Sequence, residues 1–148
     1  RMGTIIGNGR PEVLPVGEVC YDNLPEGQHA IATEQVKWDV DHAQGIGIQT
    51  GRARDLPAAT ARAVQKLARD SYKALGLSGY GRVDMRMDAS GRVYVIEANV
   101  NPDLTAIEDF AEAAQEVGMD YGQLLQRVLQ AGLGYRPAWK QGPSKKYA

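Results

Sequence analysis

Cysteine, histidine and phenylalanine are scarce in this chain of 148 residues, which contains one, two and one of them. A single cysteine excludes a disulfide within the chain and a cysteine-rich zinc site. No apolar run approaches the ~20 residues needed to span a bilayer, and no basic segment followed by an apolar one opens the chain. We therefore expect a cytoplasmic protein that has no membrane partner.

An excess of charge of one sign is also missing, because 17 lysine and arginine residues face 18 aspartate and glutamate residues. This balance argues against a protein that coats nucleic acid. The length corresponds to one domain or one large piece of a bigger one. Because the chain opens on Arg1, without an initiator methionine and directly before a predicted strand, we expect a fragment of a longer polypeptide.

Apolar periodicity predicts three helices. The clearest runs from Pro57 to Gly76, with apolar or small residues at intervals of three and four. Two more are expected over 106–117 and over 120–131, the last with Asp120 as its N-cap.

Strands are predicted before these helices and between them. The early ones cover 3–7 and 12–19, the second interrupted at Pro15, whereas residues 21–55 show no sustained period. The tail over 134–148 is predicted to be poorly ordered.

A β-hairpin is predicted where the runs 80–88 and 93–102 alternate around a Ser-Gly turn. The class is therefore α+β, an antiparallel sheet with helices packed on one face. If the turn consists of Ser90 and Gly91, Asp84 lies opposite Glu97 and Arg82 lies opposite Asn99. A four-residue loop gives the same pairing, whereas a three-residue loop shifts it.

One face of this hairpin is apolar and the other is charged. Opposite residues have Cβ atoms about 4.5–5.5 Å apart, so two facing carboxylates repel unless positive charge lies between them. Three arrangements resolve this repulsion: a ladder neutralised by arginines, a general acid/base pair in which one carboxyl group has a raised pKa, or a hard divalent cation. Oxygen donors suit Mg²⁺, which commonly binds phosphate as well. The expected faces are Val83, Met85 and Met87 toward the core, Arg82, Asp84, Arg86 and Asp88 away from it, and Val93, Val95, Glu97 and Asn99 together.

The order of residues in the hairpin, Gly81-Arg82-Val83-Asp84 followed by Glu97-Ala98-Asn99-Val100-Asn101-Pro102, resembles the metal-binding hairpin of the ATP-grasp ligases. The D-alanine–D-alanine ligase branch is the most similar. Weaker matches at 7–15, 36–39 and 110–129 follow in the same order, so the resemblance covers most of residues 3–132. It implies that residues 1–133 form the C-terminal ATP-grasp subdomain, that the part of the enzyme preceding it is missing, and that a homodimer is an allowed assembly.

The resemblance also implies the cofactors, ATP with two Mg²⁺ ions that Mn²⁺ can replace. Asp84 would bind one ion, Glu97 would bridge both, and Asn99 would bind the second. Arg82 would hold a phosphate or the acyl-phosphate oxyanion, and Lys37 would reach the γ-phosphate from a mobile loop.

Two further residues are left with two interpretations each. Ile96 either forms a wall of the adenine pocket or belongs to the core, and Arg86 either reaches the nucleotide or is solvated.

The implied activity is ATP-dependent joining of a small carboxylate to an amine through an acyl phosphate, although this fragment is expected to be inactive alone. The alternative is a non-catalytic nucleotide-binding or regulatory module of the same fold. Pro102-Asp103 stands where the ligases have Pro-Gly, and Glu108 and Asp109 follow. These acids would repel a carboxylate, which argues against D-alanine as the second substrate.

Overall fold

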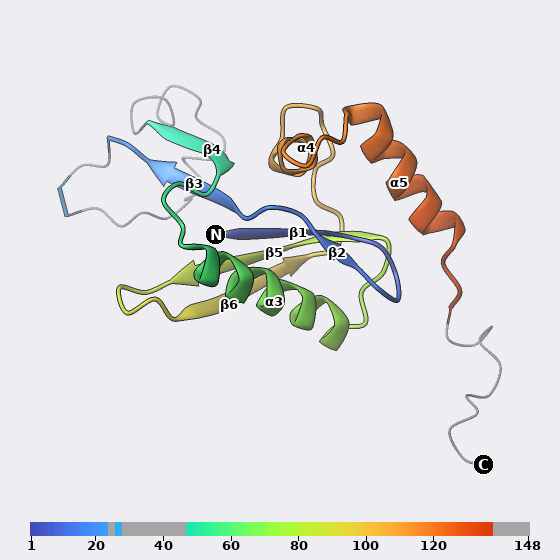
Figure 1. Cartoon of the computed structure of the whole chain (residues 1–148), viewed down its shortest axis with the longest axis horizontal. Helices are drawn as coiled ribbons and strands as arrows, with labels where there is room; N and C mark the ends of the chain where they lie inside the picture. The colour runs from blue at the N-terminus through green and yellow to red at the C-terminus, as the bar shows by residue number, and fades with distance from the viewer. Residues whose placement is uncertain (24–25, 28–46, 138–148) are drawn as a thin grey trace, which may run out of the picture.

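The computed structural model describes residues 1–23, 26–27 and 47–137, which form an antiparallel sheet with three helices (Figure 1). The strand order is β4-β3-β1-β5-β6, and β2 pairs with β1 beside this path. No helix in the described part of the chain has the length and apolar character needed to cross a bilayer. The elements are β1 (Met2–Ile6), β2 (Glu12–Val13), β3 (Gly17–Tyr21), β4 (Ile48–Arg52), α3 (Ala58–Ala74), β5 (Tyr80–Met87), β6 (Val93–Asn99), α4 (Asp109–Gln115) and α5 (Tyr121–Leu133).

Helix α3 covers one face of the sheet. Its buried side chains are Val64, Ala68 and Tyr72, spaced four residues apart as the periodicity predicts. They pack in one cluster with side chains of β1 and β5. The helix lies close to β1 because Gly3 has no side chain: a Cβ there would be 2.5 Å from the Cβ of Ala68. One apolar core of the domain is therefore the layer between α3 and the sheet.

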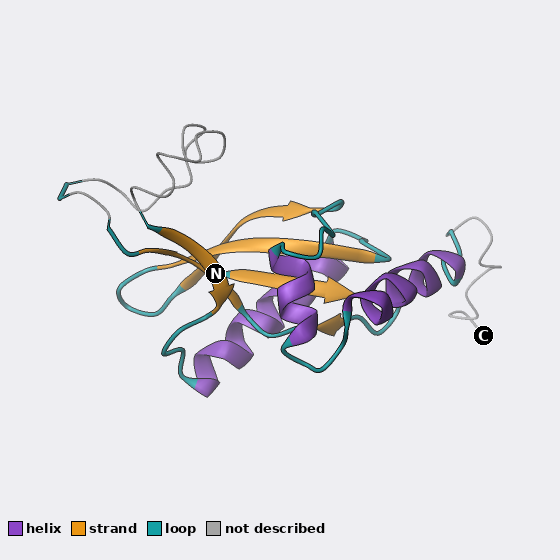
Figure 2. Cartoon of the chain, turned by 90° about the horizontal axis from the view of Figure 1, so that it is seen from above, coloured by secondary structure: helices purple, strands orange, loops and turns teal. Residues whose placement is uncertain are grey.

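Helices α4 and α5 pack on the opposite face. Ile6 joins a second cluster with Phe110 and Leu124, whereas the preceding residue, Ile5, belongs to the cluster under α3. Successive residues of a strand point to opposite faces. Both faces of β1 are thus covered, and all five of its residues are buried. The predicted antiparallel α+β sheet is confirmed, but its helices are divided between the two faces, with β1 and β5 between them in Figures 1 and 2.

The predicted helix ends are largely confirmed. Asp120 caps α5 and accepts a hydrogen bond from the backbone N–H of Gln123, whose side chain bonds back to the N–H of Asp120. The helix continues one residue past Gly132, and α4 is shorter than the predicted 106–117.

The strand predictions were less complete. Pro15 separates β2 from β3, as expected for a residue that cannot donate to the ladder. Strand β4 was missed because residues 48–52 show no alternating pattern of apolar and polar residues. These residues form a strand through their pairing with β3. Residues 134–137 continue without helix or strand, and the remainder of the predicted tail lies outside the described residues.

The hairpin register agrees with the prediction at the charged residues, although the turn does not. Asp84 is paired with Glu97 and Arg82 with Asn99. The N–H of Asp88 donates to the carbonyl of Arg92 at 2.9 Å, so three residues form the loop rather than two. Ile96 is then an extra residue in β6, a β-bulge that restores the predicted pairing.

The bulge also changes which side chains share a face. Val93 is paired with Met87 and Val95 with Met85, so both lie on the apolar side. Glu97, beyond the bulge, is paired with Asp84 on the charged side. The prediction that Val93, Val95, Glu97 and Asn99 share one face is therefore wrong, because a bulge reverses the alternation of the strand.

The loop of the hairpin is predicted to lose stability in acid. The Ser90 hydroxyl donates to Asp88 Oδ1 at 2.6 Å, and the backbone N–H of Arg92 donates to the same oxygen at 3.0 Å. These bonds, the Ser90 bond above all, lower the pKa of Asp88 from 3.8 to about 2. Because folding lowers the pKa of Asp88, its carboxylate contributes fully to the stability of the loop above about pH 4. This contribution disappears as the pH falls toward 2.

Amide hydrogen exchange measures this loss directly. We expect exchange at Ser90 and Arg92, corrected for intrinsic rates, to accelerate over this pH window. In Asp88→Asn the window should vanish, because the variant has no carboxyl group to titrate. A pH dependence that persists in the variant would assign the effect to another group.

Candidate metal and phosphate site

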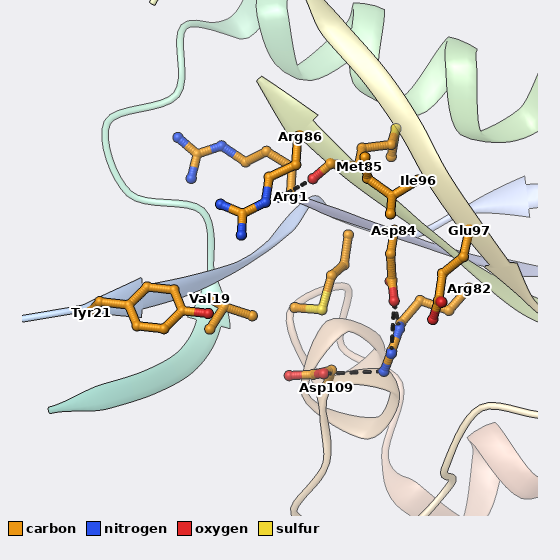
Figure 3. A pocket seen from close by; sticks show the side chains of 11 residues that line it. Arg1, Val19, Tyr21, Arg82, Asp84, Met85, Arg86, Ile96, Glu97 and Asp109 are labelled. Carbon is orange, nitrogen blue, oxygen red and sulfur yellow. Dashed lines mark hydrogen bonds and ion pairs between the residues drawn. The ribbon is translucent and has the colours of Figure 1, made fainter. Parts of the chain in front are cut away.

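Arg82 is the centre of the charged face. Its Nε donates to Asp84 Oδ1 at 2.8 Å, and its Nη2 donates to Asp84 Oδ2 at 3.0 Å, a two-bond contact between neighbours on β5. Its Nη1 also reaches Asp109 Oδ2 at 3.4 Å, at the first turn of α4 (Figure 3). The guanidinium is thus held by carboxylates from two elements, which fixes its orientation before any ligand arrives.

The surrounding acids keep Arg82 charged. Burial by itself would lower the pKa of Arg82, but the hydrogen bonds and charge of Asp84, with the charges of Asp109 and Glu97, outweigh it and raise the pKa. The side chains of Arg82, Asp84 and Asp109 are 21%, 24% and 13% exposed. Asp109 Oδ1 is buried and accepts no hydrogen bond from the described residues. The arrangement is a partly desolvated cation with an excess of negative charge around it.

Glu97 and Asn99 extend this face along β6. The carboxylate of Glu97 is exposed and makes no hydrogen bond or ion pair with the part of the chain that the structure describes. Asn99 Oδ1 accepts a hydrogen bond from the backbone N–H of Asn101 at 3.0 Å. A carbonyl oxygen has two lone pairs, so the second one is available to a further ligand.

A cavity of about 330 Å³ opens beside these residues. Its lining includes Arg82, Asp84, Arg86, Ile96, Glu97 and Asp109, and Figure 3 shows Asp84, Arg82 and Asp109 joined along one side of it. Ile96 is 63% exposed, so its interpretation as a core residue is wrong. The bulge instead places this apolar side chain at the cavity, beside the charged groups.

The oxygen donors of the face fit a hard cation. Within the described residues, no group of three or more His, Cys, Asp and Glu side chains could hold a metal ion. Two carboxylates that face each other across the hairpin and a neighbouring amide oxygen form a smaller set, the kind that Mg²⁺ completes with water and phosphate oxygens. Because both oxygens of Asp84 already bind Arg82, a cation must share this carboxylate with the arginine.

The structure brings together most of the predicted site. Arg82, Asp84, Arg86, Ile96 and Glu97 line one cavity, and Asn99 is paired with Arg82 across the hairpin. Lys37 lies outside the described residues.

Asp109 was missed as a partner of Arg82. The acid was visible at the start of a predicted helix, but nothing local indicated that α4 lies over the charged face, 27 residues from Arg82.

Comparisons with known proteins agree with this fold. A family model described as "D-ala D-ala ligase C-terminus" matches residues 3–130. The D-alanine–D-alanine ligase of Carboxydothermus hydrogenoformans is 30% identical over 131 residues, which cover 88% of this chain and 38% of that protein. The ligase of a Marinomonas species is 40% identical over 124 residues, covering 80% and 37%. The chain spans less than half the length of these curated relatives.

Solved structures share the architecture. The D-alanine–D-alanine ligase of Coxiella burnetii has a TM-score of 0.68 at 22% identity, and 89% of this chain matches 31% of that one. The Bacillus anthracis ligase, solved in complex with ATP, has a TM-score of 0.67 at 24% identity and is covered to 38%. The fold is that of the ATP-grasp ligases, as the hairpin resemblance predicted. Within that class, the chain belongs to the family of D-alanine–D-alanine ligase C-terminal domains.

Proposed function

We propose that this chain is the metal- and phosphate-binding part of an ATP-dependent carboxylate–amine ligase. The observation that carries the proposal is the single charged face on which Arg82, Asp84, Glu97 and Asn99 meet. A module released from catalysis has no chemical need for all four, so the ligase is favoured over a regulatory module. The curated relatives named as D-alanine–D-alanine ligases support the proposal.

In the proposed site Asp84, Glu97 and Asn99 hold two Mg²⁺ ions, for which Mn²⁺ can substitute. When bound, these ions neutralise charge on the phosphate oxygens of ATP. Arg82, fixed by Asp84 and Asp109, donates hydrogen bonds to the transferred phosphoryl group and then to the oxyanion of the acyl phosphate. The first carboxylate would take the γ-phosphoryl group of ATP to form an acyl phosphate, with ADP as the leaving group. The amine would then attack the acyl carbon, lose a proton and displace phosphate to give an amide-type bond.

The other assignments extend the same proposal. Arg86 and Ile96 form the nucleotide side of the cavity, and Lys37 binds the γ-phosphate. The preceding domains of the enzyme supply the rest of the ATP site and the substrate contacts, in a cytoplasmic protein that can form a homodimer. Asp103, whose pKa is lowered by hydrogen bonds from Thr105, keeps negative charge beyond Asn99 and disfavours an acceptor with a carboxylate there.

Mn²⁺ titration followed by NMR tests the proposal on the 148-residue chain. In the presence of ATP, Mn²⁺ should broaden the backbone amides of Asp84, Glu97 and Asn99 well before those of α3, which packs on the other face. Hydrolysis of ATP should stay at the background rate, since these 148 residues match less than half the length of the ligases that they resemble. Equal broadening of α3 and the hairpin, or robust turnover by the chain alone, would contradict the proposal.

A further inference from the structure

Tyr80 stands at the start of β5, on the same strand face as Arg82 and Asp84. The pairing of Arg82 with Asn99 places Asn101 opposite Tyr80 when the ladder is continued by two residues. The phenol of Tyr80 donates to Asn101 Oδ1 at 2.6 Å. This hydrogen bond ties the chain to the sheet at the point where β6 has ended and the connection to α4 begins.

A second hydrogen bond links Asn101 to Asn99, the proposed metal ligand. The backbone N–H of Asn101 donates to Asn99 Oδ1 at 3.0 Å. The position of Asn101 therefore sets the direction in which this oxygen presents its remaining lone pair. Tyr80 acts on Asn99 through Asn101, without touching the cation site itself.

Tyr80 is the fixed member of this chain of contacts. Its backbone is paired with Ile6 of β1, and its ring packs edge-on against Phe110, with the centroids 5.8 Å apart and the planes at 84°. Phe110 is buried in the core cluster under α4 and α5. Asn101, in contrast, is exposed and lies in a segment without helix or strand. Removing the hydroxyl therefore frees Asn101 and leaves the ring of Tyr80 in place.

We propose that Tyr80 is a positioning residue for the cation-binding oxygen of Asn99. The proposal rests on the proposed function, because the direction of this oxygen matters only if Asn99 binds a cation. Groups that orient metal ligands typically contribute between 10- and 100-fold to metal affinity. Tyr80 acts through one intervening residue, so we expect the lower end of this range.

Tyr80→Phe tests the proposal, with Tyr94→Phe as the matched control. Tyr94 carries the same hydroxyl on the same hairpin, but it donates to Asp88 at the loop end, at 3.2 Å. In Tyr80→Phe, the affinity for Mn²⁺ in the presence of ATP should fall roughly tenfold. Without metal, the backbone amide of Asn101 should exchange faster, and the side-chain amide resonances of Asn99 should move. Tyr94→Phe should change none of these.

A second variant removes the same bond from the other side. Asn101→Ala keeps the backbone N–H but has no acceptor for Tyr80, so it should reproduce the loss, and the double variant should lose no more than either single one. Wild-type exchange at Asn101 together with wild-type Mn²⁺ affinity in Tyr80→Phe would overturn the proposal, as would additive losses in the double variant. If the unmodified chain binds no Mn²⁺ with ATP, the proposed function fails. In that case faster exchange at Asn101 would still show that Tyr80 holds this turn.

Discussion

Glu97→Gln should abolish Mn²⁺–ATP binding by the hairpin and leave the free energy of unfolding within about 0.5 kcal/mol of its original value. The two effects separate because Glu97 is exposed and makes no hydrogen bond or ion pair within the described residues. Its carboxylate therefore contributes little to folding, yet it is the uncommitted negative charge opposite Asp84. The amide of glutamine keeps the shape of the side chain and removes that charge.

Isothermal titration calorimetry and urea unfolding measure the two quantities. In a ligase that includes the preceding domains, kcat for the variant should fall more than about 100-fold, the upper range for groups that merely orient a metal ligand. The matched control is Glu12→Gln, since Glu12 pairs with Arg127 at 2.8 Å and neither residue lines the cavity. Mn²⁺–ATP affinity that survives in Glu97→Gln, or that falls equally in Glu12→Gln, would remove Glu97 from the proposed metal site.

Arg82→Gln should lower the free energy of unfolding by roughly 2–4 kcal/mol, somewhat less than the removal of one partner from a fully buried ion pair. The reason is that Arg82 neutralises two carboxylates at once, and both are mostly buried, at 24% and 13% side-chain exposure. Without the guanidinium, Asp84 and Asp109 lose their cation, and Asp109 Oδ1 already has no hydrogen bond from the described residues. The variant should also lose the phosphate interaction proposed for this site.

Two variants separate charge from geometry. Arg52→Gln is the control for an exposed pair, because Arg52 is 78% exposed and lies 3.5 Å from Glu116; its loss should cost less than about 1 kcal/mol. Arg82→Lys keeps the charge but cannot make the two-bond contact with Asp84, so it should recover only part of the stability. An Arg82→Gln chain as stable as Arg52→Gln would show that the central ion pairs carry little folding energy.

In the hairpin, the correct pairing of the charged residues was predicted from an incorrect turn length. The Ser-Gly dipeptide indicated a two-residue turn, and the pairing of Asp84 with Glu97 followed from it. The loop has three residues, with Gly91 at φ +82, which should have shifted the register by one. The bulge at Ile96 shifts it back. Both features depend on how the strand fits against its neighbours, so the alternating pattern alone could not reveal them.

For the helices, too, the sequence predicted some features and left others to the tertiary structure. The spacing of Val64, Ala68 and Tyr72 was enough to locate α3 and its buried side, because an amphipathic stripe is a local signal. Nothing in the stripe of α5 or the short α4 indicated which face of the sheet they would cover. That choice follows from the two burial clusters, which use alternate residues of β1.

By itself, the sequence determined the hairpin, its order of arginine, acids and amide, and the positions of the long helices, since each depends on residues within a few turns of chain. Only the tertiary structure decided that α4 would lie over the charged face and bring Asp109 to Arg82. It also decided that a bulge would carry Glu97 to the side of Asp84 and place Ile96 at the cavity. These contacts join residues far apart in the chain, and their energy arises only once the sheet and helices have packed. The near-zero net charge of the chain thus conceals a local concentration of acids around one partly buried arginine, Arg82.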